Sequence, residues 1–173
     1  MYSLIRAFWN ICMLRAGPQD LPASSALFGL TVLCNVASNI LVSVSSALNE
    51  VGLGRIVLAA VAETTAMLAT VYLLLSIVGH RSRAQQTLTA LAGTATAINI
   101  LALPMFWVSP LFTTLNNPFA LLLVLLVLWS VVIVAHILRH AFSITMVPAG
   151  LLAIGYTLLN FELSYRLLGL ASK

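Results

Sequence analysis

Five long apolar stretches constrain this sequence more than any other feature, because each is long enough to cross a bilayer as a helix. They lie at residues 25–47, 56–79, 87–108, 119–138 and 143–163. A helix rises about 1.5 Å per residue and a hydrocarbon core is about 30 Å thick, so about 20 apolar residues span it. The sequence therefore predicts an all-α fold: a polytopic transmembrane helix bundle of about five spans, with residues 1–173 as one integral membrane domain.

Composition excludes an ordinary soluble domain, since 61% of the residues are hydrophobic and only 7% are charged. Once the five spans are removed, too little polar sequence remains to form a separate soluble module. The eight basic residues stand mostly at the ends of apolar stretches, and no basic block of the kind that binds nucleic acid is present. We expect the lipid bilayer, other membrane proteins or further copies of the chain as partners, and no nucleic acid.

The amino-terminal segment, residues 1–17, has the pattern of an amphipathic helix lying in the membrane interface. Apolar side chains recur at helical spacing and are expected on one face, with polar side chains on another, and Gly17 and Pro18 are expected to end the helix. The apolar set is Leu4, Ile5, Phe8, Trp9 and Cys12. A secretory signal is the alternative, but Arg15 interrupts the apolar stretch and no small-residue cleavage site follows.

The distribution of basic residues predicts the orientation of the bundle. Cytoplasmic ends of spans carry an excess of Lys and Arg. With the amino terminus in the cytoplasm, that side collects Arg6, Arg15, Arg81, Arg83 and Arg139, and the outer side holds Arg55, Arg166 and Lys173. Seven of the eight basic residues are Arg, which is typical of a GC-rich bacterial genome, so we expect a bacterial inner membrane. Arg6, Arg15, Arg81 and Arg83 are then candidates for contact with cytoplasmic partners.

Glu63 is the first candidate for a functional residue, because it lies well inside the second span. A carboxylate there must be neutralised, paired or hydrated. The face that it shares with Ala59, Ala60 and Met67 is made of small or flexible residues and suits another helix better than lipid. Three interpretations remain open: a proton or cation site, a contact point for a basic residue of a partner, or a protonated acid hydrogen-bonded to a neighbouring Asn or Thr.

Polar stripes on two other spans supply possible neighbours for Glu63. Asn35 and Asn39 lie one turn apart in the first span, and Asn99 lies in the third. Such residues either form hydrogen bonds between helices or line a ligand site. In the same third span, Pro104 is expected to kink the helix.

Other polar features carry weaker signals. His136 and His140 have metal-compatible spacing but lack a visible third ligand, so no metal site is predicted. Glu162 and Arg166 are spaced to pair as an interfacial anchor. Cys34 is expected to be a buried, inert thiol, and a redox role for Cys12 would require an activating environment.

Residues 109–118 are expected to form a tight turn or a re-entrant segment. The span 119–138, hydrophobic all round, is expected to have the most lipid contact.

No nucleophile motif, zinc-protease motif, phosphate-binding loop or dinucleotide fingerprint is present, so we expect neither an enzyme nor a bound cofactor. A different signal comes from the segment that leads from the basic loop into the Thr-, Ala- and Gly-rich third span, Arg83, Ala84, Gln85, Gln86, Thr87 and Leu88. Together with five spans and a cytoplasmic amino terminus, it resembles the bacterial Yip1-like membrane proteins. The resemblance covers the five-span core and implies membrane organisation or partner binding rather than catalysis.

The sequence thus favours a non-enzymatic inner-membrane protein that acts as a scaffold, subunit or assembly factor through helix–helix and cytoplasmic-loop contacts. The alternative is a small transporter or channel subunit with a polar intramembrane site around Glu63, Asn35, Asn39 and Asn99. The second hypothesis predicts a hydrated cavity around Glu63.

Overall fold

The computed structural model describes residues 2–47, 51–108 and 118–168. Within these ranges the chain is helical and contains no β-strand. The long helices α2 to α6 are each long and apolar enough to cross a membrane, which is the pattern of an integral membrane protein. The predicted all-α bundle with five spans is confirmed. In chain order the elements are α1 (Tyr2–Cys12), η1 (Pro18–Asp20), α2 (Ser25–Ala47), α3 (Leu53–Ile77), η2 (Arg81–Arg83), α4 (Ala84–Val108), α5 (Pro118–Phe142) and α6 (Met146–Leu167).

The spans match their predicted positions closely, with one informative difference at the end of α5. That helix continues to Phe142 rather than ending at residue 138, because Arg139 and His140 lie inside its last turn, where positive charge suits the helix dipole. Ser143 then adopts a left-handed backbone with φ of 55°. The Ile144 amide donates to the Arg139 carbonyl at 3.2 Å, a bond pattern that closes helix carboxyl ends. The expected turn or re-entrant segment at 109–118 lies almost wholly outside the described residues.

The helix α1 ends earlier than predicted, and it ends in the same way as α5. Leu14 has φ of 60°, and the Arg15 amide donates to the Asn10 carbonyl at 2.8 Å. The chain has therefore already left the helix before Gly17 and Pro18, so the prediction that those two residues stop it is wrong. At the end of α3, Gly79 takes the equivalent position with φ of 85°, a conformation that glycine adopts without strain.

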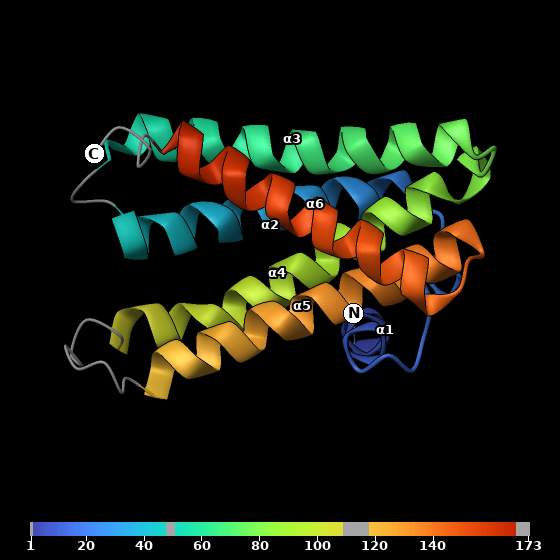
Figure 1. Ribbon diagram of the computed structural model, residues 1–173, viewed down its shortest axis with the longest axis horizontal. Helices are drawn as coiled ribbons and strands as arrows, with labels where there is room; N and C mark the ends of the chain where they lie inside the picture. Colours follow the sequence, from blue (N-terminus) through green and yellow to red (C-terminus); the bar gives the residue numbers. More distant parts are fainter. Residues whose placement is uncertain (1, 48–50, 109–117, 169–173) are drawn as a thin grey trace.

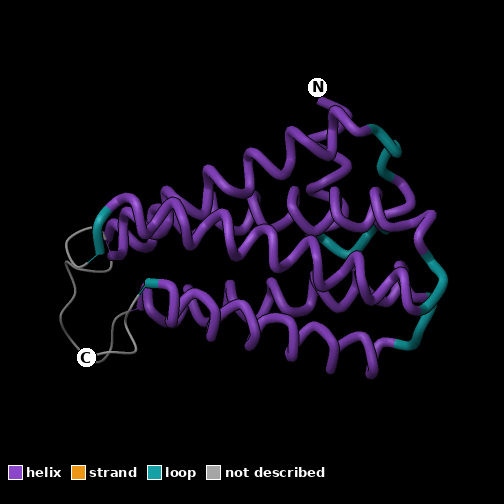
Figure 2. The backbone as a smooth tube through the Cα atoms, turned by 90° about the horizontal axis from the view of Figure 1, so that it is seen from above, coloured by secondary structure: helices purple, strands orange, loops and turns teal. Residues whose placement is uncertain are grey.

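The five spans form a closed ring in which neighbours are in contact in the order α2, α4, α5, α6, α3 and back to α2. They run side by side, as Figure 1 shows, and Figure 2 gives the same arrangement seen from above. Neighbours in the ring are antiparallel, except that α2 and α4 run in the same direction. We call one end of the bundle the α1 end, where α2, α4 and α6 begin and α3 and α5 end. The opposite end, where α3 begins and α6 ends, is called the far end.

The continuous hydrophobic core lies in the half of the bundle nearest the α1 end. Its fully buried side chains come from α3, α4 and α5, and α1 contributes Ile11. The helix α1 lies across α4 and α5, and it is seen end-on in Figure 1 while the spans run across the view. The Phe8 ring sits so close to Gly93 that a Cβ atom on that residue would overlap the ring. Glycine at position 93 is what lets α1 pack against the bundle.

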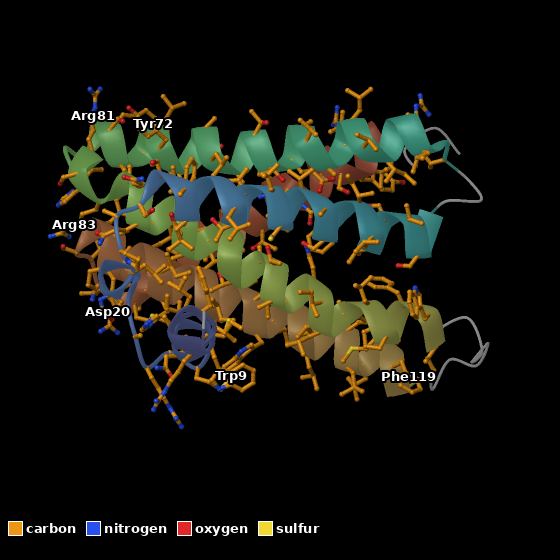
Figure 3. The ribbon with its side chains drawn as sticks, turned by 180° about the vertical axis from the view of Figure 1, so that it is seen from behind. Trp9, Asp20, Tyr72, Arg81, Arg83 and Phe119 are labelled. Atoms are coloured by element: carbon orange, nitrogen blue, oxygen red, sulfur yellow. The ribbon has the colours of Figure 1, made fainter. Side chains whose placement is uncertain are left out.

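The apolar residues of α1 share one broad face, as predicted, but the bundle covers only part of that face. Phe8, Ile11 and Cys12 pack inward, but Ile5 and Trp9 are 69% and 56% exposed. Trp9 lies on the outer side of the bundle in Figure 3. Protein covers one side of α1, which leaves Ile5 and Trp9 to face the surroundings. An exposed Trp at this position suits the membrane interface.

Burial also corrects two expectations about the spans. In α6, 11% of the residues in the most apolar 18-residue stretch are buried, whereas 28% are buried in the corresponding stretch of α5. The helix α5 is less exposed because α1 and η1 cover it as well as two spans. The span with the most outward surface is therefore α6, not 119–138. Cys34, expected to be buried, lies exposed on the outer side of α2.

Candidate functional site: a cavity among five spans

A hydrogen-bond network joins α2, α3 and α4 near the middle of the bundle. The Thr64 hydroxyl donates to Asn35 Oδ1 at 3.0 Å, which ties α3 to α2. Asn99 Nδ2 donates to Asn39 Oδ1 at 2.6 Å and to Ser38 Oγ at 3.1 Å, which ties α4 to α2. Asn35 is almost completely buried. The polar stripe of the first span thus holds helices together, which was one of the two interpretations of its sequence.

The same network forms one wall of a cavity of about 340 Å³. All five spans line it, and the lining positions run from the middle of each helix towards the far end. Glu63, Asn35, Asn39 and Asn99 all lie on its wall, so the structure brings the four candidate residues to one site. Its polar side chains are Asn35, Asn39, Glu63, Thr64, Thr94, Asn99, Ser130, Tyr156, Thr157, Asn160 and Ser164.

Glu63 is half-buried and faces α6 across the cavity wall. Ser164, Tyr156 and Asn160 line the cavity from that helix, and Ser164 lies near the Glu63 carboxyl group. The expected partner was an Asn or Thr of a neighbouring span, but Asn35 is bonded to Thr64, the residue after Glu63. Successive residues of a helix point in different directions, so α3 offers Thr64 to α2 and Glu63 to α6.

The charge of the cavity wall is one-sided. Of the described residues that line it, Glu63 alone is ionisable as an acid near neutral pH, and none is Lys, Arg or His. A buried carboxylate without a cation or sufficient water costs several kcal/mol or more, so it takes up a proton or a positively charged ligand. The arrangement can therefore exchange a proton for a cation at a position inside the membrane.

The contribution of α6 to the site was missed at the level of sequence. Tyr156, Asn160 and Ser164 are spaced by four residues each and so fall on one face of the helix. None of the three was predicted to belong to the site. A polar stripe at positions i, i+4 and i+8 on an otherwise apolar helix was the signal that pointed to them.

A search of family models, curated proteins and solved structures found no match to this chain. The resemblance to Yip1-like proteins therefore stays a prediction.

The four candidate cytoplasmic arginines all lie towards the α1 end, but they differ in what they do there. Arg6, Arg15 and Arg81 are exposed. Arg83 instead reaches the end of α5, where its Nη1 donates to Ser143 Oγ at 2.6 Å and to the His140 carbonyl at 3.4 Å. Figure 3 shows Arg81 and Arg83 at this end of the bundle. Arg83 thus caps a helix, and the other three present their charge outward.

The connection between α1 and α2 is held in place by side chains of two spans. The Gly17 amide donates to Asp20 Oδ2 at 2.8 Å, and Gln86 Nε2 donates to the Leu21 carbonyl at 2.7 Å. His136 Nε2 lies 3.0 Å from the Ala16 carbonyl, which makes this nitrogen the donor. A turn fixed at several points holds α1 against the bundle.

The histidine pair and the cysteine of the α1 end have structural environments. The rings of His136 and His140 meet edge to face at 4.7 Å, and within the described residues no third His, Cys, Asp or Glu completes a metal-binding group with them. Burial raises the pKa of the Cys12 thiol, which disfavours the reactive thiolate. The activating environment that a redox role requires is not found around Cys12.

The acid–base pair near the far end of α6 is formed as the spacing predicts. Arg166 Nε donates to Glu162 Oε1 at 2.5 Å, and both side chains are mostly exposed. Glu162 does not line the cavity. It therefore provides a carboxylate of the same chemistry as Glu63 in a different environment.

Proposed function

We propose that the protein is a non-enzymatic small membrane transporter, or the subunit of a channel, that moves a positively charged solute or a proton through its central cavity. The observation that carries this proposal is a cavity bounded by all five spans with Glu63 on its wall and no basic side chain among its described lining residues. Intramembrane acids that face a cavity between helices mark ion and proton pathways. The Asn and Thr network holds three of the walls together and is the scaffold of the site.

We further propose that the α1 end faces the cytoplasm of a bacterium and that the membrane is its inner membrane. Five arginines of the α1 end support this orientation, against two described arginines towards the far end, Arg55 and Arg166. The cavity then extends from the middle of the membrane towards the outer surface. The state described by the structure would accept its solute from outside the cell.

Flux through reconstituted vesicles tests the proposal directly. Vesicles loaded with a pH-sensitive dye and held under an imposed pH gradient receive external sodium, potassium, tetramethylammonium or benzyltrimethylammonium chloride in separate runs. We expect protein-dependent proton movement in at least one run, and we expect Glu63→Gln to abolish it because the exchanging carboxyl group is gone. Glu162→Gln is the matched control and should leave the flux unchanged. Wild-type vesicles that behave like empty ones, or a Glu63→Gln protein with full flux, would refute the proposal.

A scaffold or assembly role is the second proposal, and one observation favours it. The outer surface of α6 carries Gly150 and Gly155, and a Cβ atom on either would meet nothing within 4 Å. Large apolar side chains such as Val147 and Leu151 stand exposed nearby. Small residues between apolar ones allow another helix to approach closely. The partner that this surface suits is a membrane helix of another copy or another protein.

The association state in a mild detergent tests this second role. We expect native mass spectrometry to find an oligomer or a complex that Gly155→Trp dissociates, because the indole would occupy the contact. A monomer in the wild type, with no crosslinks to any membrane protein in cells, would end the idea. Deleting α1 is a poor test, since Phe8 and Ile11 belong to the packed core. Reversing the exposed charges of Arg6 and Arg15 probes the cytoplasmic surface without removing those residues.

A further inference from the structure

We propose that the cavity selects organic monovalent cations with an apolar body, such as hydrophobic amines or quaternary ammonium ions. This inference rests on the proposed function, because it assigns a substrate class to the same site. Three properties of the cavity lead to it: its charge, the chemistry of its walls and its size.

The charge of the cavity wall determines whether the ligand is a cation or an anion. Glu63 contributes a carboxyl group, and the described lining contains no Lys, Arg or His to neutralise it. Ser164 lies near that carboxyl group but carries no charge. When Glu63 is protonated, entry of a cation displaces its proton, which passes to water outside the cavity, so the site stays neutral throughout. An anion or a zwitterion gains no such compensation.

The walls set the chemistry of the body of the ligand. Away from Glu63 the lining is mainly aliphatic, with Met67, Leu91 and Ile98 on one side and Leu123 and Leu126 on another. Aromatic rings stand among them, contributed by Phe106, Tyr156 and Phe161. Apolar walls favour ligands that bury carbon, and aromatic faces attract ammonium groups. A ligand with both a cationic centre and an apolar body satisfies the two parts of the cavity at once.

The same walls disfavour inorganic ions as the preferred ligand. Calcium and magnesium require about six or more oxygen ligands, usually with several carboxylates. Within the described residues no group of three or more His, Cys, Asp or Glu side chains gathers, and Glu63 is the one carboxylate on this wall. A small ion would shed its water against aliphatic side chains. The volume of about 340 Å³ instead falls at the lower end of the range for pockets that hold small organic molecules.

Binding to the purified full-length protein in an uncharged detergent tests the inference without any transport step. The probe is benzyltrimethylammonium chloride, measured by isothermal titration calorimetry. Its neutral carbon isostere, neopentylbenzene, controls for shape, and tetramethylammonium controls for the apolar body. We expect the probe to bind at least about tenfold more tightly than either control, which corresponds to one step of about 1.4 kcal/mol. Glu63→Gln should weaken it at least about tenfold, whereas Glu162→Gln should leave it unchanged.

Each outcome decides one of the two proposals. Equal binding of the probe and its isostere, or full binding by Glu63→Gln, overturns the substrate class. A thermal unfolding midpoint of Glu63→Gln close to that of the wild type shows that the variant is folded, and Glu63→Asp, which keeps the charge, should retain part of the affinity. Binding without any flux in vesicles would keep the ligand class and reject transport. Flux of inorganic ions without binding of the probe would keep the transport function and reject the ligand class.

Discussion

The two halves of the bundle are built from similar helices but are packed in opposite ways. Towards the α1 end, residues such as Leu75, Ile133 and Ile137 are fully buried in one continuous core, and α1 adds a further layer. Towards the far end, the same five spans surround a cavity of about 340 Å³, and among the described residues only a smaller buried cluster, which includes Ile56 and Ala59, packs there. Hydrophobic composition alone does not account for this contrast, because apolar side chains line the cavity as well as the core.

The difference follows from what fills the space between the helices. At the α1 end, Phe8 lies against Gly93, and Gln86 and His136 hold the connection to α2 in place. In the other half, the contacts between spans include the polar pairs of Asn35, Asn39, Thr64 and Asn99. Directional hydrogen bonds fix the spacing of the helices without filling the interior. The helices are thus packed tightly at the α1 end, and polar side chains hydrogen-bond them to one another around the cavity in the other half. This arrangement is suited to holding the site open.

The contrast is tested most strongly by the same substitution in both halves of one helix. Leu138 of α5 is 2% exposed in the core, and Leu126 of α5 lines the cavity. We expect Leu138→Ala to lower the free energy of unfolding by about 2–5 kcal/mol and Leu126→Ala by about 1 kcal/mol, because the latter already faces empty space on one side. Steric-trapping unfolding in detergent measures both. Equal losses would mean that the two halves are packed alike.

A glycine pair gives the next largest effect. Gly93→Leu should force the Phe8 ring away and lower the unfolding free energy by about 1–3 kcal/mol through overpacking. Gly155→Leu, where a Cβ meets nothing within 4 Å, serves as the control and should change stability by less than about 0.5 kcal/mol. Limited proteolysis should also cut the α1 connection faster in the Gly93 variant. If that variant is as stable as the control, α1 does not pack at Gly93.

The hydrogen bonds around the cavity predict a smaller, pairwise effect. A double-mutant cycle with Asn39→Val and Asn99→Val should give a coupling energy of about 0.6 kcal/mol, the average for hydrogen bonds between membrane helices. The unfolding free energies of the four proteins supply this value. A coupling of zero would show that the two amides do not bond in the membrane.

The smallest predicted effect lies at the end of α5. Arg83→Gln removes the guanidinium that bonds Ser143 and the last carbonyls of the helix, and we expect a loss of about 0.5 kcal/mol. Arg81→Gln is the neighbouring control and should be close to neutral, since no side-chain hydrogen bond joins Arg81 to another described residue. Hydrogen exchange in the last turn of α5 should increase in the first variant only.

Hydropathy was sufficient to predict the number and approximate positions of the spans, because the bilayer imposes a length and an apolar composition on each of them. Helix ends were harder to predict. Leu14 and Ser143 end helices in a left-handed conformation that favours glycine, so neither residue marks the end in the sequence. Cys34 was mispredicted for another reason, which also left the exposure of Ile5 and Trp9 on the apolar face of α1 unpredicted: periodicity shows which residues share a face but not whether protein or lipid covers it.

The candidate site could be predicted in part. Glu63 stood out because a carboxyl group inside a span is expensive, and three Asn residues stood out as polar side chains in apolar helices. Their pairing depends on which spans are neighbours. The contact of α3 with α6, which are separated by two other spans in the sequence, brings Ser164 to Glu63, and no local pattern contains that information.

Accessibility of position 63 to water is the most direct test of the central claim, a hydrated cavity that contains Glu63. In a protein with Cys12→Ala and Cys34→Ala, Glu63→Cys is compared with Thr65→Cys, which lies at nearly the same depth on the exposed outer side of α3. A membrane-impermeant, positively charged thiol reagent is added to sealed vesicles on the side of the membrane where the far end of the bundle lies. We predict that Glu63→Cys reacts much faster than Thr65→Cys. Equal, slow reaction at both positions would contradict the account, because it would leave Glu63 sealed between helices with no water-filled path to it.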